Sequence, residues 1–265
     1  MVVAVNTIIA TAVDVVADTN FIAHSKASIE ALKSAILLKN LNLNVLIVGE
    51  FGTGKTTLAK TIVDAKIVDC SNFHEALNAL TLNQTLILKN FHKIADYESF
   101  KNDIKLNSIR VIATSHESIN SNIIDDFFGA KITLLPLKQR EEDIELLSQK
   151  FFHEAKLLFL NDCSSLKLKD IELDLSKNIH SLRYSIYKAV IISSFAENDV
   201  LKIMEKFLED KIGSGNDYRE QLYLFDVPLI RAGYKKFNSQ LIMSEKFGIN
   251  RNTLRKNIKE LNNFL

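Results

Sequence analysis

The sequence predicts an α/β fold in which a mostly parallel sheet is followed by purely helical segments. Two observations predict it. After Pro136 the apolar period stays helical to the end of the chain. Before it, five apolar runs of strand length, rich in β-branched residues, alternate with helical stretches: residues 45–48, 66–70, 85–90, 108–115 and 131–135. These runs have no polar face, which is typical of parallel strands covered by helices on both sides.

The helical stretches follow from apolar residues at the spacing of one helix face. They are expected at residues 27–41, 56–65, 73–80, 141–160, 181–194 and 200–211. The sequence Gly-Ser-Gly-Asn-Asp at residues 213–217 is rich in turn formers and predicts a linker.

Charge is distributed unevenly along the chain. The 265 residues carry a formal net charge of +1, but from Arg231 onward there are eight Lys and Arg against two Glu, a net charge of +6, which leaves −5 for the rest. A length of this order suits one large or two to three small domains. The asymmetry indicates a nucleic-acid-facing end on an acidic body.

The sequence disfavours a metal or redox site at the cysteines and a membrane span near the N-terminus. Cys70 and Cys163 lie far apart and fit no metal or redox spacing, so reduced thiols in a cytoplasmic protein are expected. Residues 1–19 are apolar, but they lack a basic leader, include Asp14 and are too interrupted to span a bilayer. We expect a lead-in segment or strand there and no membrane association.

A phosphate-binding motif follows the first predicted strand. Residues 49–56 read Gly-Glu-Phe-Gly-Thr-Gly-Lys-Thr and precede a predicted helix, which is the context that a P-loop requires. Backbone N–H groups would wrap phosphate oxygens, Lys55 would reach the β and γ phosphates, and Thr56 would ligate Mg²⁺. The alternative is a Gly-rich turn without a ligand. The expected nucleotide-binding residues of the loop are Gly49, Gly52, Thr53, Gly54, Lys55, Thr56 and Thr57.

The basic end of the chain has the pattern of a helix-turn-helix. Asn238 is expected to cap a first helix with Leu241, Ile242, Met243 and Phe247 on its apolar face, and Gly248 to form the turn. Asn250 would cap a second helix packed through Leu254, Ile258 and Leu261. The expected DNA-binding residues are Asn250, Arg251, Asn252, Thr253, Arg255, Lys256 and Lys259. The alternative is a solvated basic helix that packs on a partner.

Several motifs together resemble the sigma-54-dependent enhancer-binding proteins of the AAA+ class. The sequence GEFGTGKTTLAKTI resembles their phosphate loop, RVIATSHE their sensor-one strand, and LPLKQREEDIELLSQKFF the start of their helical lid. SKNIHSLRYSIYKAVIIS is similar to the sensor-two helix and GINRNTLRKNIKEL to a Fis-type recognition segment. The resemblance implies a lead-in segment (1–19), a P-loop α/β subdomain (20–135), a helical lid (136–212), a linker (213–217) and a Fis-type helix-turn-helix domain (218–265).

The chain departs from that family at the residues that hydrolyse ATP. Lys89 and Asn90 stand where the family carries an Asp-Glu pair for Mg²⁺ and water, and a replacement role for Asp69 is an alternative. His180 aligns with the sensor-two Arg and is carried over as a nucleotide-binding residue, and His116 aligns with the sensor-one Asn. Lys131 is the one cation where subunit-bridging arginines are expected, and the GAFTGA loop that contacts sigma-54 is missing from the sequence. No catalytic residue is therefore assigned.

Three functions remain open. The favoured one is a DNA-binding transcriptional regulator whose AAA+ core binds ATP or ADP, with or without Mg²⁺, without efficient hydrolysis. The second is an active ATPase that acts on sigma-54 RNA polymerase, and the third is a non-catalytic adaptor subunit in a ring of enhancer-binding relatives. The expected partners are double-stranded DNA, a second copy of the chain, and related enhancer-binding proteins or RNA polymerase. The second copy is expected to bind through the C-terminal domain, at an amphipathic helix pair within residues 222–237.

Overall fold

The chain is described by a computed structural model over residues 21–81, 84–94, 96–116, 119, 121–159 and 166–263. The expectations for residues 1–19 and for Cys163 lie outside the described residues. The chain forms two compact units that divide between Ser194 and Phe195.

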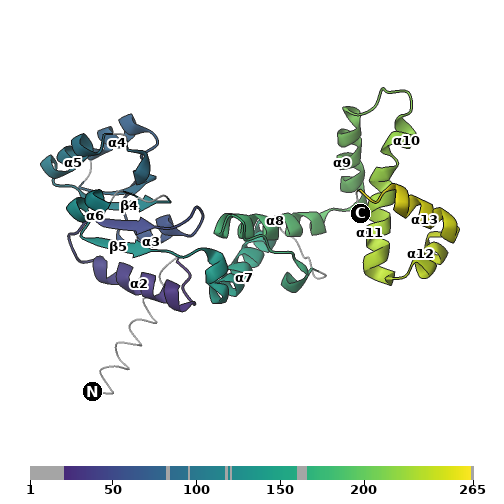
Figure 1. Cartoon of the computed structure of the whole chain (residues 1–265), viewed down its shortest axis with the longest axis horizontal. Coiled ribbons are helices and arrows are strands. Elements are labelled where there is room, and N and C mark those ends of the chain that lie inside the picture. Colours follow the sequence, from purple (N-terminus) through teal and green to yellow (C-terminus); the bar gives the residue numbers. More distant parts are fainter. Residues whose placement is uncertain are drawn as a thin grey trace, which may run out of the picture. The chain divides into compact units, whose positions relative to one another are not determined.

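The first unit contains a parallel sheet, in which Figure 1 labels β4 and β5. The sheet has five strands in the order β2-β3-β4-β1-β5. The strands are β1 (Val45–Val48), β2 (Lys66–Asp69), β3 (Thr85–Lys89), β4 (Arg110–Ser115) and β5 (Ala130–Thr133). All five lie within the predicted runs or one residue outside them. Crossover connections place the carboxyl ends of the strands at one edge, where ligands of open α/β sheets bind.

Helices cover both faces of the sheet, as predicted. One face packs against α2 (Lys26–Leu38) and α3 (Lys55–Ile62), and the other against α4 (Phe73–Leu80), α5 (Tyr97–Leu106) and α6 (Ser121–Phe127). The strands carry apolar residues on both faces because both are buried: Leu46 faces one core and Ile47 the other. α5 and α6 are absent from the sequence prediction.

A helical lid follows the sheet within the first unit. Its main helices are α7 (Glu141–Leu158) and α8 (Ile179–Ser194), close to the predicted 141–160 and 181–194, with short 3-10 turns at Leu137–Gln139 and Leu168–Asp170. Leu147 and Phe151 of α7 pack against Leu182 and Ile186 of α8. Another 3-10 turn, Phe91–Lys93, follows β3.

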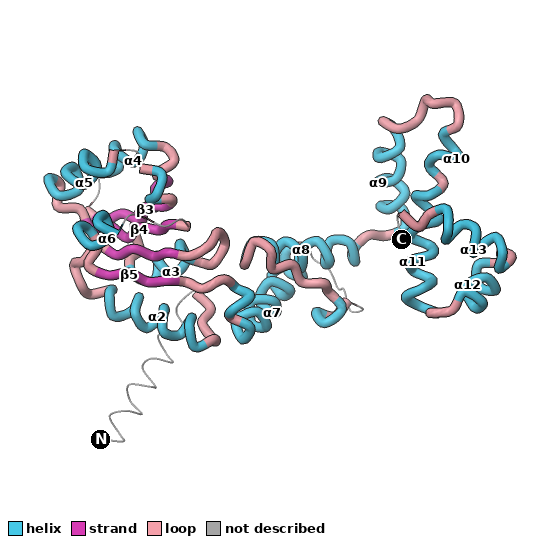
Figure 2. The backbone as a smooth tube through the Cα atoms, in the orientation of Figure 1, coloured by secondary structure: helices cyan, strands magenta, loops and turns pink. Residues whose placement is uncertain are grey.

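The second unit is helical, as the tube in Figure 2 shows. It contains α9 (Glu197–Glu209), α10 (Asp217–Gln221), α11 (Tyr223–Phe237), α12 (Gln240–Phe247) and α13 (Arg251–Glu260). The boundary differs from the predicted one: α9 was assigned to the lid, and the linker at 213–217 lies inside the second unit. α9 buries none of its residues. Its amphipathic pattern therefore does not indicate packing in the core of the lid.

The three last helices share a small core built on Ile230, Met243 and Leu254. α11 and α12 approach closely at Gly233, where an added Cβ would lie 2.5 Å from Phe247 Cζ. Gly248 ends α12 with φ 67°, a left-handed conformation that favours glycine, so the predicted turn is present.

Three local predictions in this unit were wrong. Asn238 does not cap α12 but ends α11 in the left-handed conformation, and Ser239 precedes α12 without a side-chain cap. Leu241 and Ile242 are exposed rather than in the core, because α12 turns only Met243 and its neighbour Ser244 fully inward. The expected helix pair within residues 222–237 is one helix, α11, with Pro228 inside it.

Candidate functional site

The P-loop connects β1 to α3 at the carboxyl edge of the sheet. Gly52 and Gly54 have φ of 79° and 97°, and Gly54 is the N-cap of α3, so the loop needs glycine at both positions. Backbone N–H groups at a helix N-terminus favour an anion, so this geometry suits phosphate. Lys55 Nζ donates to Gly49 O at 2.7 Å and to Glu50 O at 2.6 Å, and Thr53 Oγ1 donates to Glu50 O at 3.0 Å.

The charge of Lys55 is sensitive to its surroundings. Burial lowers the pKa of Lys55 to about 8, and the nearby Glu50 carboxylate opposes this shift. A bound phosphate would favour the ammonium form further, because an opposite charge favours the ionised state.

The lid is hydrogen-bonded directly to the loop. Asn178 Nδ2 donates to Phe51 O at 2.9 Å and to Glu50 Oε2 at 3.1 Å, and Asn178 Oδ1 accepts from Leu137 N at 2.6 Å. Arg140 Nη2 donates to Thr53 O at 3.0 Å. Neither Asn178 nor Arg140 was singled out in the sequence. The signal available was a polar residue at the start of each lid helix, which local pattern alone does not distinguish from a cap.

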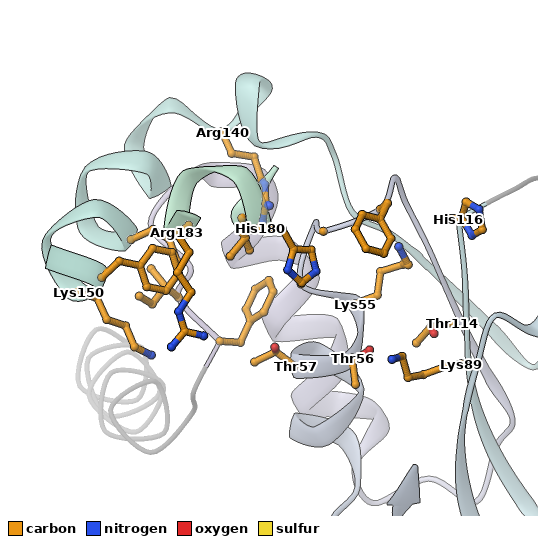
Figure 3. A pocket seen from close by; sticks show the side chains of 18 of the residues that line it. Lys55, Thr56, Thr57, Lys89, Thr114, His116, Arg140, Lys150, His180 and Arg183 are labelled. Atoms are coloured by element: carbon orange, nitrogen blue, oxygen red, sulfur yellow. The ribbon is translucent and has the colours of Figure 1, made fainter. Parts of the chain in front are cut away.

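The loop and the lid enclose a pocket of about 500 Å³ (Figure 3). This volume lies in the range of small-molecule sites. Of the expected nucleotide-binding residues, the lining includes Gly52, Gly54, Lys55, Thr56, Thr57 and His180. Gly49 and Thr53 do not line it, and Thr53 is fully buried.

The pocket is strongly basic. Its lining includes five cationic side chains, Lys55, Lys89, Arg140, Lys150 and Arg183. Glu154 is the one carboxylate among the described lining residues, and it accepts hydrogen bonds from Arg183 at 3.2 Å and from the Tyr187 hydroxyl at 3.1 Å. Lys150 and Arg183 were missed in the sequence, although Arg183 follows His180 by three residues and therefore shares its helix face.

The end of β3 brings Lys89 and Asn90 to this pocket. Asn90 has a left-handed backbone, and its side-chain amide donates to both carboxylate oxygens of Asp69 at 3.0 Å. Burial alone would raise the pKa of Asp69, but hydrogen bonds from Asn90 and Ser71 and the charge of Lys89 lower it to about 2. Asp69 is thus an ionised partner of Asn90 and does not line the pocket.

The two histidines at the expected sensor positions both line the pocket. His180 lines the pocket from α8 and stacks on Phe51, with ring centroids 4.9 Å apart. His116 lines it at the end of β4 and packs edge-on against His92 at 4.2 Å. Lys131 is exposed on β5.

The donor set does not fit Mg²⁺. Thr56, the expected ligand, lines the pocket beside Lys89 rather than beside a carboxylate (Figure 3). Mg²⁺ prefers one or two carboxylates along with phosphate and water oxygens. Over the described ranges, no cluster of three His, Cys, Asp or Glu could hold a metal ion.

The second unit presents the other predicted site. Asn250 caps α13, where its side chain accepts from Asn252 N at 2.8 Å, as predicted. Leu254 is fully buried, and Ile258 and Leu261 pack partly buried against the same core. The remaining expected DNA-facing residues are all exposed on α13: Arg251, Asn252, Thr253, Arg255, Lys256 and Lys259. Lys256 also lies 3.7 Å from Glu260.

In the described ranges, no helix has both the length and the apolar character needed to cross a bilayer.

Comparison with known proteins identifies the fold. Residues 21–99 match the family described as the sigma-54 interaction domain. A search of curated protein sequences finds no match. Among solved structures, NtrX from Brucella abortus has a TM-score of 0.55 at 15% identity, over 91% of this chain and 69% of that chain.

Two further NtrX structures from Brucella abortus, in complex with ATP and with ADP, each have a TM-score of 0.52 at 14% identity, again over 91% of this chain and 69% of that one. Identities this low carry the fold and nothing finer. The chain therefore has an α/β AAA+ fold with a parallel five-stranded sheet, followed by a helical C-terminal region.

Proposed function

We propose that this protein is a DNA-binding transcriptional regulator whose AAA+ core binds ATP or ADP without efficient hydrolysis. The observation that carries the proposal is the contrast between its two sites. The pocket keeps the phosphate-binding loop but offers a lysine and an amide at the end of β3, while α13 exposes a complete basic face.

Nucleotide binding is supported by the shape and charge of the pocket. A left-handed glycine pair, the N-terminus of α3 and Lys55 together favour phosphate, and the lining is cationic. Two of the three similar NtrX structures are complexes, one with ATP and one with ADP. Phe21, Ile22 and Ile179 add apolar surface of the kind that accommodates a base.

Slow or absent hydrolysis follows from the groups at the end of β3. Phosphoryl transfer is accelerated by positioning the attacking water and by neutralising charge around the γ-phosphate. Asn90 cannot accept a proton from water, and its amide is held by Asp69. The absence of a GAFTGA sequence removes the usual contact with sigma-54, so remodelling of that polymerase by the usual loop is not part of the proposal.

DNA recognition is assigned to α13 by its chemistry. The helix follows a left-handed turn, is anchored through Leu254, and exposes Arg251 and Asn252 in its first turn, where major-groove helices contact base edges. Arg255 and Lys259 follow at helical spacing and suit phosphates.

We propose that the second unit forms a homodimer. It exposes large apolar side chains on α9 and near the start of α11, among them Leu201, Ile203, Phe207, Leu222 and Phe225. Two half-sites would compound the affinity of one small module. Sedimentation equilibrium should show a dimer that Phe225→Glu dissociates, and a monomer at all concentrations would contradict this step.

DNA binding is tested by titrating labelled duplexes at several salt concentrations. We expect binding to weaken steeply with salt, because bound counterions are released. Replacing Arg251 and Arg255 with Ala should reduce affinity by about tenfold or more, since base and phosphate contacts are lost. The matched control replaces Lys202 and Arg219, exposed cations of the same unit, and should bind as the wild type does. Equal binding by both double variants would overturn the assignment of α13.

Hydrolysis is tested by phosphate release with and without Mg²⁺. We expect no turnover above that of Lys55→Ala. Mg²⁺-dependent turnover that disappears in Lys55→Ala would instead establish an active ATPase. Co-purification with an enhancer-binding relative, together with a change in that relative's ATPase rate, would favour the adaptor role.

A further inference from the structure

Lys89, at the end of β3, stands where the resemblance implies an acid that supports Mg²⁺. Lys89 is half-buried, is the last residue of β3 and lines the same pocket as Thr56 and Thr114. In Figure 3 its side chain points toward Thr56, on the same side of the pocket as Lys55. Two ammonium groups therefore face the region of the phosphate loop.

Glu154 and Asp69, two described carboxylates at or near the pocket, already accept hydrogen bonds from other side chains. Glu154 accepts from Arg183 and Tyr187 on the lid, where Figure 3 places Arg183 and Lys150 away from Lys89. Asp69 accepts two hydrogen bonds from Asn90 and a third from Ser71 N at 2.9 Å. Among the described lining residues, a divalent cation at Thr56 would thus meet like charge from Lys89 and no free carboxylate.

We propose that this pocket binds its nucleoside phosphate as the metal-free anion, with the Lys89 ammonium supplying the charge that Mg²⁺ supplies elsewhere. A lysine is a compact point charge that can donate to several phosphate oxygens. Lys89 is the last residue of β3 and lies in register with Asp69 of β2. Pairing within the sheet therefore fixes the backbone that carries this ammonium group. The inference rests on the proposed nucleotide binding and specifies the ionic form of the ligand.

The proposal is tested by titrating the full chain with a fluorescent ATP analogue, in excess Mg²⁺ and in EDTA. Metal-free ATP carries more negative charge than its Mg²⁺ complex, so we expect affinity in EDTA to equal or exceed that in Mg²⁺. Affinity tenfold or more weaker in EDTA would overturn the inference while leaving nucleotide binding intact. No binding in either condition would overturn both.

Variants identify the residue responsible. Lys89→Asp supplies a carboxylate and should invert the preference, so that binding is at least about tenfold weaker in EDTA than in Mg²⁺. Lys93→Asp makes the same change at an exposed lysine outside the pocket and should keep the wild-type preference. Lys89→Met keeps the length of the side chain without its charge and should weaken binding about tenfold in both conditions. Wild-type behaviour of both Lys89 variants would overturn the proposal.

Discussion

Lys55 combines a binding role with an ammonium group that burial partly disfavours. Burial brings the pKa of Lys55 down to about 8, with Glu50 opposing the shift, and both acceptors of Lys55 are carbonyl oxygens of the loop. Its ammonium form is therefore the main form at neutral pH and the minor form one pH unit above 8. Above pH 8, Lys55 must take up a proton when a phosphate binds, and this uptake lowers the affinity for the nucleotide.

We predict that nucleotide affinity falls as pH rises through about 8. The bound anion raises the pKa of Lys55, so the complex holds a proton that the free protein loses, and affinity at pH 9 should be about tenfold lower than at pH 7. Isothermal titration calorimetry in buffers of different ionisation enthalpy would also detect proton uptake at pH 9. Lys55→Ala should bind weakly without this dependence, whereas Lys60→Ala, an exposed lysine on the same helix, should retain it. A flat profile for the wild type would contradict the link to Lys55.

Asp69 and Asn90 show how an acid can remain near a site without serving as a base. Asn90 follows β3, and Asp69 ends the neighbouring strand β2. The amide of Asn90 bridges to both oxygens of Asp69, which stays ionised down to about pH 2 through hydrogen bonds and the charge of Lys89. A carboxylate with so low a pKa is a poor proton acceptor at neutral pH.

At the scale of elements, the helix-turn-helix depends on one small core. Leu254 of α13 is 0% exposed and packs with Ile230 and Met243, whereas Leu241 of α12 is 51% exposed. Replacing each of these two leucines with Ala therefore compares the loss of a buried side chain with the loss of an identical exposed one.

We predict that Leu254→Ala destabilises the second unit by about 2–5 kcal/mol, the usual cost of removing a buried leucine side chain. Leu241→Ala should change stability by less than about 0.5 kcal/mol, because its side chain is already in water. Hydrogen exchange of the α11–α13 amides in the full chain measures both. Equal protection in the two variants would show that Leu254 does not hold α13 in place.

Elements were predictable where one local property decides them. The strand β4 is a continuous apolar run, and α13 combines an Asn cap with apolar residues at helical spacing, so both were found. α5 is a mostly polar helix whose buried apolar residues are Phe100 and Ile104, and so few apolar positions do not predict a helix. Leu241 was misplaced because the buried face of α12 is set by its packing against α11 and α13, which the sequence of α12 alone does not show.

Contacts between distant segments escaped prediction for the same reason. The phosphate loop was found from its own eight residues, but Asn178 and Arg183 reach the site only because α8 packs beside the loop. Asn178 lies 127 and 128 residues after its loop partners Phe51 and Glu50, and no local pattern in the sequence identifies such contacts. Motifs thus predict the chemistry of the site, whereas the number of cations around it is a property of the fold.

At the scale of the whole first unit, a buried ion pair joins three stretches of the chain. Asp143, which is 0% exposed, accepts from the backbone N–H groups of His24 and Ser25 at 2.6 and 2.7 Å and from the hydroxyl of Ser28. Arg140 Nη1 lies 3.6 Å from Asp143, and Arg140 continues to the phosphate loop through Thr53 O. The start of α2, the lid and the loop therefore share one charged centre.

We predict that Asp143→Asn destabilises this unit by about 3 kcal/mol, because it leaves the buried Arg140 without its counter-charge. A loss of this size lowers the melting temperature of a unit of this length by roughly 10 °C. Glu142→Gln removes an equal charge one residue away at an exposed position and should cost less than about 1 kcal/mol.

Because Arg140 also donates to Thr53 O, the Asp143→Asn variant should bind ATP more weakly at temperatures where it is fully folded. Differential scanning calorimetry with and without ATP separates the two effects: a variant that melts early but gains the wild-type increment from ATP would show that the ion pair stabilises the lid without positioning the loop.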